Sequence, residues 1–146
     1  MRGISLLAVI VGGVVDVALS SILGLLLGVY VITSRGWTQI PREQLSRALA
    51  AVLHEDLLLS AAQLAIGFGC SVLGGFVAAS IAKRRKLYNG LLASWLCVII
   101  GLFSQLPDFR LASLAWRFAT ITLTPLCYMA GAYIRVKMQQ NVPTRA

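Results

Sequence analysis

The sequence predicts an all-α integral membrane protein: a compact bundle of four transmembrane helices, with a short amphipathic interfacial helix in the first outer loop. Three observations lead to this fold class. The chain of 146 residues is 58% hydrophobic and only 12% charged, whereas a water-soluble domain averages about 45–50% apolar and about 25% charged residues. Its mean hydropathy is +0.83. The apolar residues are gathered in four long runs, with one substantial loop after the first run and short connections between the others.

Each apolar run is long enough to cross a bilayer as a helix. The hydrocarbon core is about 30 Å thick, and a helix crosses it with about 20 residues. No run alternates in polarity as a membrane β-strand would, and a helix satisfies its own backbone hydrogen bonds in lipid. We therefore expect a single domain with spans at 4–32, 57–82, 87–106 and 111–134. The first run contains a charge and continues to residue 32, which favours a retained helix over a cleaved signal peptide.

The loop between the first two spans predicts the interfacial helix, at residues 41–53. Pro41 suits the first position of a helix. Apolar residues then recur at the helical i, i+3, i+4, i+7 spacing, at Leu45, Ala48, Leu49 and Val52. Such a helix can lie on the outer membrane surface. A plain connector whose apolar face covers the bundle is the alternative.

The distribution of Lys and Arg predicts the orientation, because cytoplasmic flanks carry an excess of these cations. One side of the predicted bundle holds eight of them: Arg2, Lys83, Arg84, Arg85, Lys86, Arg135, Lys137 and Arg145. The other side holds five: Arg35, Arg42, Arg47, Arg110 and Arg117. We therefore expect both termini in the cytoplasm and a location in the cell inner (plasma) membrane. The net charge of +8 then reflects topology and attraction to anionic lipid headgroups, and no nucleic-acid partner is expected.

Asp16 and Arg117 are the candidate functional residues inside the spans. Asp16 lies about 12 residues, or roughly 18 Å, from the cytoplasmic end of its span. An acid at that depth costs about 2.5–3.5 kcal/mol, so it faces protein or water. It is a proton or cation site, a charge that binds a partner, or a protonated hydrogen-bond donor to a neighbouring helix. Arg117 can reach the outer interface, and pairing with Asp16 would have to bridge roughly 10 Å along the helix axes.

Small residues recur at every fourth position in the first two spans. The first span has them around the acid, at Gly12, Ser20, Gly24 and Gly28, and the second at Gly67, Ser71, Gly75 and Ala79. In lipid, faces of small residues let helices approach closely. We expect these faces to mark helix packing, within the chain or with another chain.

No motif points to an enzyme, a metal site or a cofactor. The chain lacks a nucleophile elbow, a P-loop, an HExxH motif and a dinucleotide fingerprint. Cys70, Cys97 and Cys127 have no His or Met at ligand spacing and are interpreted as small buried hydrophobic residues. The expected function is that of an interaction, assembly or accessory subunit that contacts itself or a larger membrane protein. The alternative is an oligomeric small transporter or channel that uses Asp16.

Overall fold

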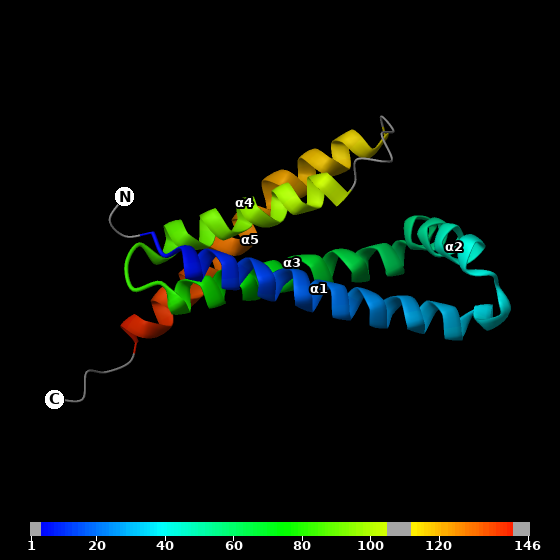
Figure 1. Ribbon diagram of the computed structural model, residues 1–146, viewed down its shortest axis with the longest axis horizontal. Helices are drawn as coiled ribbons and strands as arrows, with labels where there is room; N and C mark the ends of the chain where they lie inside the picture. The colour runs from blue at the N-terminus through cyan, green and yellow to red at the C-terminus, as the bar shows by residue number, and fades with distance from the viewer. Residues whose placement is uncertain (1–3, 105–111, 142–146) are drawn as a thin grey trace. The chain divides into compact units, whose positions relative to one another are not determined.

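The computed structural model describes residues 4–104 and 112–141, and this part of the chain is helical, without a strand (Figure 1). The α-helices are α1 (Leu6–Ser34), α2 (Arg42–Glu55), α3 (Leu57–Ile81), α4 (Lys86–Ser104) and α5 (Ala112–Gln140). A short 3₁₀ helix, η1 (Trp37–Gln39), lies between α1 and α2. The all-helical fold class is confirmed.

The helix ends follow from capping residues. Pro41 precedes α2 rather than occupying its first position, and its carbonyl oxygen accepts the backbone N–H groups of Gln44 and Leu45, both at 3.0 Å. Asp56 separates α2 from α3. Its carboxylate accepts the N–H of Leu58 at 3.0 Å, which satisfies a donor that the first turn of a helix leaves open.

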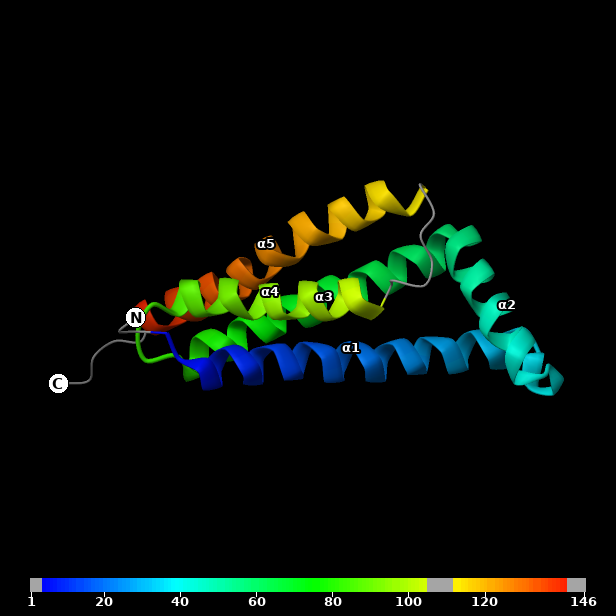
Figure 2. The same cartoon turned by 45° about the horizontal axis from the view of Figure 1, so that its top comes forward.

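The chain forms two compact units that divide α1 and α3 along their length. The first unit comprises Met1–Val17 and Phe68–Ala146, and the second comprises Ala18–Gly67. In the first unit, the start of α1, the turn between α3 and α4, and the end of α5 lie at one end (Figures 1 and 2). Its buried residues are mainly small, among them Ala8, Ala78, Ala79, Ala93 and Ala132. Val9, Ala78 and Ala93 form one buried cluster with the large side chain of Tyr128.

The second unit is held together near the ends of its helices. Leu49 of α2 lies 3.6 Å from where a Cβ of Gly28 would stand, so α2 packs on α1 at this point. Arg35 forms an ion pair with Asp56 at 3.6 Å. Its guanidinium also lies 5.9 Å from the centre of the Trp37 ring.

Two of the described helices, α1 and α3, are long and apolar enough to cross a membrane. Only 28% of the apolar stretch of α1 and 33% of that of α3 is buried within the protein. Large apolar side chains are correspondingly exposed, such as Leu25 at 68% and Leu57 at 86%. The described apolar part of α4, Lys86–Ile100, is shorter.

Candidate functional site

Asp16 lies inside the first unit and accepts hydrogen bonds from two other helices. Its side chain is 6% exposed. The carboxylate Oδ2 accepts the hydroxyl of Ser71 on α3 at 3.2 Å and the phenol of Tyr128 on α5 at 2.8 Å. Both donors are buried, with Ser71 at 6% and Tyr128 at 0% exposure. One oxygen of the acid therefore joins α1, α3 and α5.

The fourth helix of the unit joins this site through Cys97. The Cys97 Sγ lies 3.0 Å from the Tyr128 Oη and 3.7 Å from the carbonyl oxygen of Gly13. A phenol has one hydrogen to donate. When Tyr128 donates to Asp16, a hydrogen bond with Cys97 would have the thiol as its donor, but the thiol also has one hydrogen, and the carbonyl oxygen of Gly13 competes for it. Cys97 thus brings α4 into contact with both α5 and α1 at this site.

Small residues bring the helix backbones close enough for these bonds. A Cβ at Gly12 would stand 2.7 Å from the Cβ of Ala78. At Gly74 it would stand 2.9 Å from the Tyr128 Oη and 3.0 Å from the Asp16 Cβ, and at Gly75 it would stand 2.7 Å from the Tyr128 Cα. Carbon atoms normally pack at about 3.5–4.0 Å, so the described positions admit only glycine without a shift of the helices.

The predicted packing residues fall into two groups. Gly12, Ser71 and Gly75 lie in the first unit, at or beside the contacts of Asp16. The others lie in the second unit: Ser20 is half-buried, Gly28 faces Leu49, and a Cβ at Gly24 or Gly67 would meet no described atom within 4 Å.

Arg117 lies in α5, but its side chain is outside the described part of the chain, as is that of His54. The structure brings Asp16 together with two hydroxyls and, through Tyr128, with a thiol. The pairing of Asp16 with Arg117 stays a prediction.

Tyr128 and Cys97 belong to the site, and the sequence analysis did not single them out for it. Tyr128 carries a usable indication, because a tyrosine that is buried within an apolar run needs a partner for its hydroxyl. Cys97 carries no such indication in the sequence, because a free cysteine is often buried simply as a small apolar side chain.

The arrangement has the chemistry of a hydrogen-bonded acid. Within the described residues, no group of three or more His, Cys, Asp or Glu side chains could hold a metal ion. Among the described residues, the structure shows an ion pair between Arg35 and Asp56 but none at Asp16. The partners that it shows for Asp16 are the neutral hydroxyls of Ser71 and Tyr128.

Comparison with known proteins yields no match to a family model, to a curated protein or to a solved structure.

Proposed function

We propose that the chain is a multi-pass inner-membrane protein that acts as an interaction, assembly or accessory subunit. Its single domain would cross the membrane four times, through α1, α3, α4 and α5, with both termini in the cytoplasm. The observation that carries the proposal is that Asp16 accepts its hydrogen bonds from the chain itself, from Ser71 and Tyr128.

The contacts of Asp16 support a structural role for the acid. An acid in a membrane span marks either a transport pathway or a polar contact between helices. Here the donors are hydroxyls that are themselves buried, at 6% and 0% exposure. Two helices thus hold the acid at a fixed register, as interhelical polar contacts do in membrane bundles.

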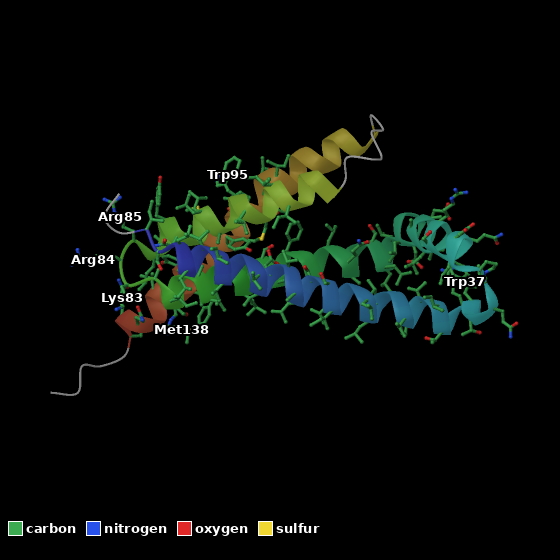
Figure 3. The ribbon with its side chains drawn as sticks, viewed as in Figure 1. Trp37, Lys83, Arg84, Arg85, Trp95 and Met138 are labelled. Atoms are coloured by element: carbon green, nitrogen blue, oxygen red, sulfur yellow. The ribbon has the colours of Figure 1, made fainter. Side chains whose placement is uncertain are left out.

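Helix length and exposure support the four spans. With 19 residues, α4 is about 28 Å long at about 1.5 Å per residue, which nearly matches a hydrocarbon core of about 30 Å. Trp95, 51% exposed, points outward from α4 (Figure 3), and α5 has 29 residues. The tetrad Lys83–Lys86 between α3 and α4 supports the cytoplasmic assignment, because Lys and Arg accumulate on that side.

The second unit supplies surface for another helix. Gly24 is exposed and has no described atom within 4 Å of a Cβ, while Leu25 beside it is 68% exposed. Close approach at small residues drives helix association in lipid. We therefore place the partner, a second copy or a larger membrane protein, against this part of α1.

Gly24→Leu tests the proposal cleanly. The added side chain meets open space inside the chain, so the isolated fold should keep its stability while a partner helix is displaced. Wild type and variant are purified from membranes in mild detergent, and their assemblies are compared by size and composition. Leu26→Ile, on another face of α1, is the control.

We expect the wild type and Leu26→Ile to leave the membrane in a complex that Gly24→Leu has lost. A wild type that is monomeric in mild detergent would contradict the proposal. So would a complex that survives Gly24→Leu unchanged. Proton-coupled flux in liposomes that Asp16→Asn abolishes would instead favour the small-transporter alternative.

A further inference from the structure

The turn between α3 and α4 presents four consecutive cations, which we call the basic turn: Lys83, Arg84, Arg85 and Lys86. The first three side chains are exposed. They project from the end of the first unit, near Met138 of α5 (Figure 3). The basic turn is thus a concentrated positive surface on one end of a helical unit.

The backbone of the basic turn is held in place by a buried amide. Asn89 is 0% exposed, and its Nδ2 donates to the carbonyl oxygens of Arg84 at 3.0 Å and Arg85 at 3.1 Å. Its Oδ1 accepts the backbone N–H of Ser5 at 2.9 Å. Arg85 has a φ of 49°, a left-handed conformation that non-glycine residues rarely adopt. These bonds hold the backbone of the turn in a defined shape, from which the exposed cations project.

The last turns of α5 add to the same surface. Lys86 donates a hydrogen bond from Nζ to the Oε1 of Gln139, which places the end of α5 beside the turn. Lys137 is exposed. The guanidinium of Arg135 lies 5.6 Å from the centre of the Phe76 ring, and its buried Nε finds no hydrogen-bond acceptor among the described residues.

The positive charge of this surface is not neutralised within the described part of the chain. The sequence has five acids, and Asp16 is the one that the structure places in the first unit; Glu43, Glu55 and Asp56 belong to the second, and Asp108 lies outside the described residues. The ion pair shown by the structure is that of Arg35 and Asp56. Within the described residues no acid faces this surface, so an anion from outside could balance its charge.

Apolar side chains adjoin the cations directly. Leu87 and Tyr88, the next two residues of α4, are 41% and 51% exposed. On α5, Tyr133, Ile134 and Met138 are 58%, 46% and 52% exposed. A phospholipid matches this order of side chains, because its phosphate group can lie over the cations and its acyl chain over the exposed apolar side chains. A free phosphate or a nucleic acid would leave the apolar side chains uncovered.

We propose that the basic turn and the end of α5 bind the headgroup of an anionic phospholipid, whose acyl chains lie along the exposed start of α4. The inference rests on the membrane location in the proposed function, but not on the accessory role. Each Lys or Arg near an anionic surface strengthens binding by roughly fivefold, so two of them contribute about 30-fold.

The test compares three full-length proteins in a nonionic detergent: wild type, Lys83→Gln with Arg84→Gln, and a control that removes two cations of α2, Arg42→Gln with Arg47→Gln. Each is titrated with phosphatidylglycerol and with phosphatidylcholine of the same acyl chains, and bound lipid is counted by intact-protein mass spectrometry. Wild type is also titrated in 1 M salt, which shortens the screening length to about 3 Å, and with inorganic phosphate.

We expect the wild type and the α2 control to prefer phosphatidylglycerol, and the variant of the basic turn to bind it about 30-fold more weakly. The preference should vanish in 1 M salt, a result that needs no variant to fold. Equal binding of the two lipids by wild type would overturn the inference, as would phosphate binding as tight as lipid binding. Failure of the wild type to stay in alkali-washed membranes would instead overturn the membrane location itself.

Discussion

Gly75→Ala tests the close approach of α3 and α5 that forms the Asp16 site. The added Cβ would stand 2.7 Å from the Cα of Tyr128 and 2.8 Å from its carbonyl carbon, or about 0.8 Å inside normal carbon contact. The obstruction is backbone, so no rotamer change relieves it and the two helices must separate. Overpacking of this kind costs about 1–3 kcal/mol.

Gly67→Ala is the matched control in the same helix. Its Cβ would meet no described atom within 4 Å. Both substitutions replace a helical glycine with alanine, which by itself favours the helix by about 1 kcal/mol, so this gain cancels in the comparison. We expect Gly75→Ala to be less stable than Gly67→Ala by about 1–3 kcal/mol.

The assay is the free energy of unfolding in mixed micelles, obtained by titrating in a denaturing detergent and following tryptophan fluorescence. Gly131→Ala should behave like Gly75→Ala, because its Cβ would stand 2.9 Å from the backbone nitrogen of Phe76. Equal stability of Gly75→Ala and Gly67→Ala would refute the close α3–α5 approach, and with it the geometry of the Asp16 site.

Three further outcomes are expected. Tyr128→Phe removes the phenolic hydroxyl that donates to Asp16 at 2.8 Å and should lower the unfolding free energy by about 1–3 kcal/mol. Tyr133→Phe, at a side chain that is 58% exposed, should leave the unfolding free energy unchanged. Equal losses in the two variants would count against the buried hydrogen bond. Asp16→Asn keeps an oxygen that accepts from both hydroxyls, so thermal denaturation in detergent should find the variant folded and assembled; failure of assembly would indicate an ionised acid paired with a cation. A reporter active only outside the cytoplasm should work when fused at Asp108 and fail after Lys86; the reverse pattern would contradict the proposed orientation.

The helices could be predicted from the sequence because their ends carry local chemical indications. Pro41 and Asp56 bracket α2, and the cations before Leu87 interrupt the apolar pattern where α3 and α4 separate. These features act over a few residues, so a single chain displays them. Burial of Asp16 also follows from the cost of an acid in an apolar run.

The partners of Asp16 could not be predicted in the same way. Tyr128 is 112 positions from Asp16 in the sequence, and several other hydroxyl residues lie in the apolar runs, such as Ser94 and Thr124. The periodicity of the sequence shows which face of a helix is lined by small residues, but it does not show which helices pack against each other through these faces. The division at Val17 and Gly67 is equally hidden, because it falls within continuous apolar helices.

The hydrogen bonds of Asp16 have a consequence for biosynthesis. Ser71 follows Asp16 by 55 residues and Tyr128 by 112. At a synthesis rate of about 5–20 residues per second, the first partner emerges about 3–11 s after the acid and the second about 6–22 s after it. Until Ser71 emerges, the first helix carries a polar group that has neither of these partners. Its passage from the insertion machinery into lipid should therefore wait at least for α3, so a nascent chain truncated before Ser71 should remain at the insertion site longer than one truncated after Tyr128.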